Sequence, residues 1–171
     1  IASLDKAIAE GAIEDCRSLD GVFWVQAYIQ AKTPKIIRAE FIGGKFHYAV
    51  EVDTSEGFEL CPADVCEIDA APVSGEFCMR DSGEEKFRIL TDYDHPDIAK
   101  YEAFLTQERI DVAAIESIEA ADGARYSYDI NVNTNYNQGA EQKAETLKQG
   151  AYDRLAAYLA NQLDSQMKQA A

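Results

Sequence analysis

Carboxylate and amide side chains recur at every second position in the segment Asp129–Asn133. Successive side chains of a β-strand point to opposite faces, so Asp129, Asn131 and Asn133 project together if this segment is extended. Carboxylate and amide oxygens are the hard ligands that Mg²⁺ and Ca²⁺ prefer. The spacing therefore predicts a divalent-cation site on one face of a strand.

An upstream strand supplies a second carboxylate if the chain turns at residues 122–123. That turn places Glu116 directly opposite Asp129 and the small residue Ala114 opposite Asn131. Directly opposed residues have Cβ atoms about 4.5–5.5 Å apart, and two carboxylates there repel unless a cation lies between them or one is protonated. We therefore expect Glu116, Asp129 and Asn131 to be the metal ligands.

The same register predicts an apolar opposite face, on which Ile115 faces Ile130 and Ser117 faces Tyr128. A one-residue slip in register would exchange the two faces of the hairpin.

A simpler interpretation of the acidic pair stays open. Glu116 and Asp129 could be solvated residues on the wet face of an antiparallel sheet, and the asparagines that follow could be turn residues. The sequence alone does not separate this interpretation from a metal site.

The elements that must position these residues are predicted from periodicity and from turn residues. Gly43-Gly44 supplies the positive φ of a tight hairpin turn. Asp94 is expected to cap the helix that follows it, and Gly150 is able to interrupt the last helix. The predicted strands are Val22–Ile29, Lys35–Ile42, Lys45–Asp53, Ile110–Glu119 and Arg125–Val132, and the predicted helices are Ser3–Cys16, one that begins at Asp94-His95-Pro96, and Gln138–Met167.

Hairpins and flanking helices in this order predict an α+β fold, an antiparallel β-sheet with flanking helices in a single domain spanning residues 1–171. The formal net charge of -15 argues against a nucleic-acid or anionic-membrane surface. No run of eighteen apolar residues and no basic leader is present, so a cytoplasmic protein is expected.

Four cysteines are too few for a disulfide scaffold in a chain of this size. Cys61 and Cys66 have a spacing compatible with half of a zinc site, but no second pair of ligands follows them. Reduced thiols are therefore expected. The span from Glu56 to Gly83 mixes Gly, Pro, Ser and three of the cysteines, and it is expected to be a long excursion.

Several of these segments occur in the order seen in ATP-grasp ligases. The resemblance rests on Val25–Ile29, on Ile36-Ile37-Arg38 with Phe41–Lys45, and on Glu116 with Asp129–Asn133. The chain looks most like the branch that includes glutamate-adding ligases and glutathione synthetases. The resemblance covers roughly residues 22–137, and its most specific part is the acidic-x-Asn motif together with the acid upstream of it.

The resemblance implies an enzyme that couples ATP cleavage to joining a carboxylic acid to an amine or thiol, through an acyl-phosphate. ATP and Mg²⁺ would be the cofactors, with the small acid and the amine or thiol as partners. By position, Arg38 matches the arginine that meets the phosphate. The segment Gln26, Ala27 and Tyr28 matches the hinge that reads adenine, and Glu116, Asp129 and Asn131 match the magnesium ligands.

The sequence also departs from the family pattern. Ala27 and Lys35 stand where the family has a carboxylate for the ribose, and Thr134–Asn137 replaces the usual Ser/Thr-Pro-Gly. Nothing before Val22 resembles the lysine-bearing strands and glycine-rich phosphate flap. We therefore expect the chain to be the C-terminal part of an ATP-grasp enzyme, inactive without the rest of its parent chain. The alternative is a non-catalytic ATP-grasp-like binding module or an inactive remnant.

Overall fold

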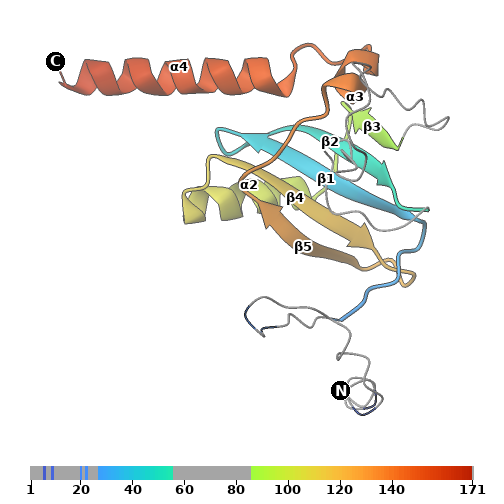
Figure 1. Ribbon diagram of the computed structural model, residues 1–171. Coiled ribbons are helices and arrows are strands. Elements are labelled where there is room, and N and C mark those ends of the chain that lie inside the picture. Colours follow the sequence, from blue (N-terminus) through green and yellow to red (C-terminus); the bar gives the residue numbers. More distant parts are fainter. Residues whose placement is uncertain are drawn as a thin grey trace.

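A five-stranded antiparallel sheet forms the centre of the molecule in the computed structural model (Figure 1). The structure describes residues 27–55 and 86–170, together with Lys6, Ala9, Asp20 and Val22. The strands lie in the order β3-β2-β1-β4-β5, with β1 at the centre and β3 and β5 at the edges. Their bounds are Lys35–Ile42 (β1), Lys45–Asp53 (β2), Phe87–Leu90 (β3), Val112–Glu119 (β4) and Arg125–Asn131 (β5).

Helix α2 (Asp97–Glu108) covers one face of the sheet, called here the α2 face. Its buried Leu105 packs with Phe41 of β1 and Ile115 of β4. Aromatic rings complete this core, since the ring of Phe41 makes edge contacts with Phe46 and Tyr101. The α2 face is therefore an ordinary apolar interface between a helix and a sheet.

The chain that leaves β5 crosses the opposite face of the sheet before it reaches α3 (Gln138–Lys143) and α4 (Ala151–Ala170) (Figure 1). We call residues 132–137 the crossing segment and this side of the sheet the crossing face. Tyr136 of this segment packs with Tyr48, Val50 and Ala151 in a second buried cluster. The crossing face is therefore covered by the crossing segment and by the first turns of α4.

Several predicted elements are confirmed and three are corrected. The β1–β2 and β4–β5 hairpins form as predicted, with positive φ at Gly43 and Gly44. The predicted helix Gln138–Met167 is two helices, because residues 144–150 separate α3 from α4, and this break ends at Gly150, the position at which the sequence allowed an interruption. Asp94 does not cap α2, since Pro96 occupies the N-cap position and no side-chain cap bond forms there.

The predicted strand Val22–Ile29 is the third correction, where the structure describes it. Residues 27–29 have no strand assignment, and the side chains of Val22 and Tyr28 are exposed. The remainder of this strand lies outside the described residues, as do the four cysteines, the span 56–83 and most of the predicted first helix.

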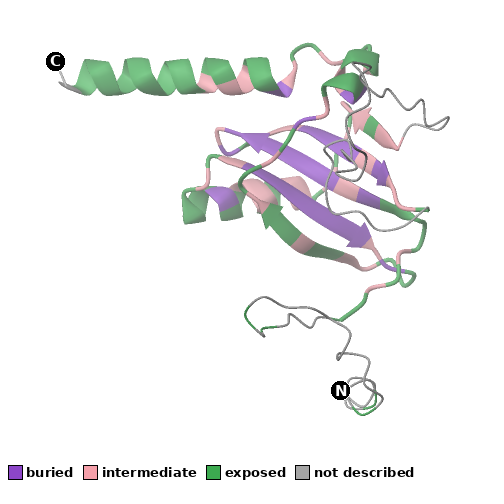
Figure 2. Ribbon diagram, viewed as in Figure 1, coloured by how far each residue is buried: buried purple, intermediate pink, exposed green. Residues whose placement is uncertain are grey.

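Burial is concentrated in the central strands (Figure 2). β5 is an edge strand with exposed Tyr126 and Ile130, and α4 is exposed beyond Tyr158. Within the part of the chain that the structure describes, no helix has both the length and the apolar character needed to cross a membrane. The observed class is α+β, as the sequence predicts.

Candidate functional site

The predicted register of the acidic pair is confirmed. Glu116 of β4 lies opposite Asp129 of β5, and Ala114 lies opposite Asn131. On its other side Glu116 lies opposite Arg38 of β1. Side chains from three neighbouring strands therefore form one row on the crossing face, in the order Arg38, Glu116 and Asp129.

A β-bulge corrects the other half of the predicted register. The pairing shifts between Glu116 and Ser117, so Ser117 faces Ser127 and not Tyr128. A bulge adds a residue to one strand and redirects a side chain. The hydroxyl of Tyr128 donates to Oε2 of Glu116 at 2.8 Å. The bulge therefore brings Tyr128 to the acidic residue on its neighbouring strand.

Glu116 is a buried carboxylate, with 4% of its surface exposed. Burial raises its pKa, while the hydrogen bond from Tyr128 and the charge of Arg38 act in the opposite direction. Its Oε1 lies 3.7 Å from Nη1 of Arg38. The open interpretation of a solvated acidic pair is therefore wrong for Glu116 and holds for Asp129, which is exposed.

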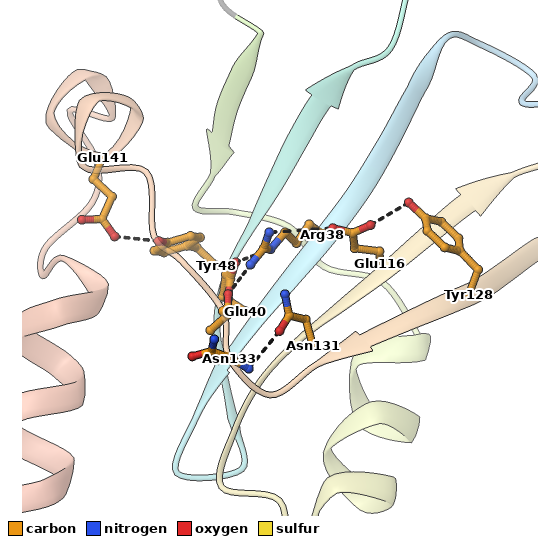
Figure 3. Close-up of polar contacts among 9 residues, drawn as sticks. Arg38, Glu40, Tyr48, Glu116, Tyr128, Asn131, Asn133 and Glu141 are labelled. Carbon is orange, nitrogen blue, oxygen red and sulfur yellow. Dashed lines mark hydrogen bonds and ion pairs between the residues drawn. The ribbon is translucent and has the colours of Figure 1, made fainter. Parts of the chain in front are cut away.

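Arg38 is held by two further side chains, and we call Arg38, Glu40 and Thr134 the Arg38 network. Its Nε donates to Oε1 of Glu40 at 2.7 Å. Its Nη2 donates to the hydroxyl of Thr134, which in turn donates to Oε2 of Glu40 at 3.0 Å. The three side chains close a ring of contacts between β1 and the crossing segment. Figure 3 shows Arg38 beside Glu40 and Glu116.

The two charged side chains of the Arg38 network are almost completely buried. Arg38 and Glu40 are each 1% exposed. Burial raises the pKa of Glu40 to about 7, although the nearby guanidinium of Arg38 favours the ionised form. Within the described part of the chain, Nη1 of Arg38 is a buried donor without a hydrogen-bond partner.

The remaining predicted ligands come from β5. Oδ1 of Asn131 accepts a hydrogen bond from the backbone N–H of Asn133 at 2.8 Å. Figure 3 shows Asn131 on the same side of the sheet as Arg38 and Glu116. The described residues contain no cluster of three His, Cys, Asp or Glu side chains suited to a metal. The predicted ligand set of Glu116, Asp129 and Asn131 has only two carboxylates, and its third member is an amide.

The predicted adenine hinge is described only in part. Gln26 lies outside the described residues. Ala27 and Tyr28 are both exposed, with 89% of Tyr28 accessible to solvent. The segment joins the sheet at Ala31, which forms an isolated bridge with Ala120. Ile29 and Ala31 pack against the buried cluster of the crossing face.

A second polar contact anchors the helices beside this site. The hydroxyl of Tyr48, which faces Glu40 across the β1–β2 pair, donates to Oε1 of Glu141 at 2.6 Å (Figure 3). The backbone N–H of Ala151 donates to the same oxygen at 2.9 Å. Glu141 therefore caps the start of α4 and ties α3, α4 and β2 together.

Sequence reasoning missed Glu40, Thr134 and Tyr128. Glu40 had a usable signal, since it lies two residues after Arg38 in a predicted strand and so shares its face. Thr134 is far from β1 along the chain, and its contact depends on how the crossing segment lies. Tyr128 reaches Glu116 because of the bulge, and no residue type in the sequence indicates that a bulge forms there.

Within the row, Asp129 is the residue exposed to solvent, whereas Arg38 and Glu116 are buried against each other. No family model, curated protein or solved structure matches this chain.

Proposed function

We propose that the chain is the C-terminal part of an ATP-grasp ligase, which joins a small carboxylic acid to an amine or thiol with ATP and Mg²⁺ through an acyl-phosphate. The rest of the parent chain would supply the phosphate flap and the substrate domain. A cytoplasmic location is part of the same proposal. The proposal rests on the resemblance of the sequence and on the charge pattern of the crossing face.

The row Arg38, Glu116 and Asp129 is the observation that carries the proposal. It joins three adjacent strands on one face of the sheet. Phosphoryl transfer needs cations that neutralise phosphate oxygens and a basic group beside them. A row with two carboxylates next to an arginine offers both kinds of contact within one site.

Carboxylate and amide oxygens are the donors that Mg²⁺ prefers, and the proposal takes them from Glu116, Asp129 and the neighbouring Asn131. Oε1 of Glu116 lies 3.7 Å from Nη1 of Arg38, which is longer than a hydrogen bond. Asp129 is exposed, and the carbonyl oxygen of Asn131 has a second lone pair beyond the bond from Asn133. When bound, Mg²⁺ would neutralise phosphate charge, while these residues hold it and Tyr128 holds the other oxygen of Glu116.

Roles for Arg38 and the hinge follow the resemblance. Arg38 would contact a phosphate oxygen. Its guanidinium is buried, so this contact requires the crossing segment to move away from it. The backbone of Gln26, Ala27 and Tyr28 would bind the adenine edge of ATP, and the exposure of Ala27 and Tyr28 leaves room for that contact.

Binding and turnover of ATP test the proposal. We expect a protein that contains this chain with its parent sequence to release ADP and phosphate when it is given ATP, Mg²⁺, an acid and an amine. Asp129→Ala and Asn131→Ala should abolish this release, whereas Asp164→Ala, in the exposed part of α4, should leave it unchanged. Unchanged turnover in the first two variants would refute the site.

A non-catalytic binding module is the second candidate. It is favoured by the Arg38 network, because Glu40 and Thr134 already satisfy two nitrogens of a buried guanidinium. A module of this kind would bind Mg-ATP in a calorimetric titration and would release no ADP with any acid and amine. Turnover by the parent protein would exclude it.

A further inference from the structure

A second β-bulge turns a histidine toward the crossing face. The β1–β2 pairing shifts so that Glu40 faces Tyr48 and Phe41 faces Phe46, which leaves His47 without a partner on β1. Phe46 packs with Phe41 on the α2 face, whereas the ring of His47 lies beside that of Tyr48, with centroids 4.7 Å apart. A bulge redirects a side chain, and here it directs His47 toward α4.

His47 contacts α4 through a bond that requires its neutral ring. Nη1 of Arg154 lies 3.1 Å from Nδ1 of His47. A guanidinium can only donate, so Nδ1 accepts and the proton of the neutral ring is on Nε2. Among the residues that the structure describes, Nε2 is a buried nitrogen without a hydrogen-bond partner.

The groups around His47 come from three elements and from the segment that joins α3 to α4. Burial and the charge of Arg154 lower the pKa of His47 from 6.5 to about 4. The charge of Glu141 on α3 and the backbone of Gln149 act in the opposite direction. Tyr48 on β2 stays neutral, because burial raises the pKa of its phenol. The docked helix therefore favours the neutral imidazole.

The turn of α4 that carries Arg154 also supports the crossing segment. The ring of Tyr152 makes an edge contact with Tyr136, with centroids 5.2 Å apart, and Ala151 is buried in the same cluster as Tyr136. Beyond Tyr158 the helix is exposed and extends away from the sheet (Figure 1). The attachment of α4 to the sheet therefore depends on its first turns.

We propose that His47 and Arg154 form an acid-sensitive contact that holds the start of α4 on the crossing face, and that protonation of His47 releases it. Protonation removes the lone pair of Nδ1 that Arg154 binds and places two cations in contact. Movement of α4 away from the sheet separates these cations and uncovers Tyr136 of the crossing segment. The inference does not rest on the proposed function, since it uses none of the residues assigned to ATP or Mg²⁺.

The direction of the pH dependence follows from the two states of His47. The imidazole binds a proton at its ordinary pKa of 6.5 when α4 is undocked, and at about 4 when it is docked. Docking is therefore strongest above pH 6.5 and weakens as the pH falls toward 4. From about pH 7.5 to about pH 5, the docking equilibrium constant should fall about 30-fold.

Native-state hydrogen exchange of the α4 backbone amides tests the proposal. An isolated helix of this length is marginal in water, so the first turns of α4 lose protection when the helix leaves the sheet. After correction for the intrinsic exchange rate at each pH, the opening equilibrium of these amides should rise about 30-fold at the lower pH. The amides of α2, on the opposite face, are the internal control and should show no such rise.

Three variants assign the response to the proposed contact. His47→Asn keeps an acceptor for Arg154 and does not titrate, so its α4 amides should stay protected at both pH values. His95→Asn removes the other histidine of the chain and should respond as the unmodified chain does. Arg154→Met removes the second cation and should reduce the response. Circular dichroism at both pH values confirms that each variant is folded.

The outcomes decide the proposal. If folded His47→Asn loses α4 protection as the unmodified chain does, another group such as Glu141 is responsible and the proposal is refuted. Equal losses from α2 and α4, or no loss from α4 in the unmodified chain, would also refute it. The imidazole signals of His47 in the unmodified chain give a test that needs no variant. Titration by nuclear magnetic resonance should show a pKa well below 6.5, and a value at or above 6.5 would overturn the proposal.

Discussion

The two faces of the sheet bury different kinds of side chain. On the α2 face, Phe41, Leu105 and Ile115 are buried among apolar neighbours. On the crossing face, Arg38, Glu40 and Glu116 are buried beside one another. Burial of apolar surface stabilises a fold directly, at about 25 cal/mol per Å². Burial of charges costs desolvation that their mutual attraction only partly offsets.

The difference shows which face stability alone would produce. Apolar residues of similar volume would serve a purely structural crossing face as well as the Arg38 network does, or better. Buried ionisable groups with shifted pKa values are common at functional sites. The α2 face therefore supports the fold, and the crossing face is where we look for chemistry.

Loss of the arginine should have the largest effect on this contrast. Arg38→Met leaves Glu40 and Glu116 buried without their counter-charge, and we expect the free energy of unfolding to fall by about 3–5 kcal/mol. Phe41→Ala on the α2 face should cost a similar amount, about 3–5 kcal/mol, through lost packing. Urea unfolding measures both.

Rescue distinguishes the two variants. Adding Glu40→Met and Glu116→Met to Arg38→Met removes the unpaired charges, so most of the lost stability should return. The same two substitutions in the Phe41→Ala background should not restore it. A cost of Arg38→Met below about 1 kcal/mol, in the range of exposed ion pairs, would contradict the charge-burial explanation.

Stability on the crossing face should depend on pH through Glu40. Its pKa is raised from 4.5 to about 7 in the folded chain, so the folded state holds a proton that the unfolded state releases. The contribution of Glu40 to stability is therefore full below pH 4.5 and is lost as the pH rises to about 7.

Glu40→Gln should remove this part of the pH dependence. The measurement is the difference in free energy of unfolding between the unmodified chain and the variant, taken across the same pH range. Carboxyl groups that do not interact with Glu40 cancel in that difference, whereas the nearby Glu116 is coupled to it. Parallel pH profiles for the two proteins would show that Glu40 does not titrate with a raised pKa.

The anchor of α4 on the crossing face gives a smaller effect. A Cβ at Gly43 would lie 2.9 Å from Cδ2 of Tyr158, whereas a Cβ at Gly123 would have no atom within 4 Å. Both glycines have positive φ, so Gly43→Ala and Gly123→Ala share the backbone strain. We expect Gly43→Ala to cost about 1–3 kcal/mol more, from the displaced ring.

Thermal unfolding of the two alanine variants measures this difference, and replacing Tyr158 should reduce it. Equal melting temperatures would mean that the ring of Tyr158 moves away without cost. In that case α4 would not be anchored at the β1–β2 turn.

The rim of the α2 face should give the smallest effect. Nζ of Lys45 lies 2.8 Å from Oε2 of Glu102, and the side chain of Lys45 is largely exposed. Exposed ion pairs contribute about 0.2–1 kcal/mol and weaken with salt. Lys45→Ala should therefore change the free energy of unfolding by less than about 1 kcal/mol, and added salt should reduce the difference. A larger loss of unfolding free energy that does not depend on salt would contradict the view that this ion pair contributes little to stability.

Local patterns predicted much of the sheet. Alternation of side chains and the turn residues Gly43-Gly44 and Asp122-Gly123 predicted both hairpins, including Glu116 opposite Asp129. The β-bulge was not predictable, because it depends on how β5 fits against β4. Gly150 indicated a possible break between α3 and α4, whereas the contact of the Glu141 carboxylate with the first N–H of α4 depends on the fold.

The candidate site was predictable as a set of residues and not as a set of contacts. Glu116 and Asp129 have similar chemistry in the sequence, yet one is buried and the other is exposed. Their surroundings come from segments far apart along the chain, Thr134 beside Arg38 above all.

Sequence by itself determined the α+β class, the two hairpins and the row of acidic and amide residues, because these depend on side-chain period and on neighbours close along the chain. Tertiary structure alone decided that Arg38, Glu40 and Glu116 are buried together under the crossing segment. Burial sets the dielectric environment and the available partners of a charge, and contacts between distant segments decide both.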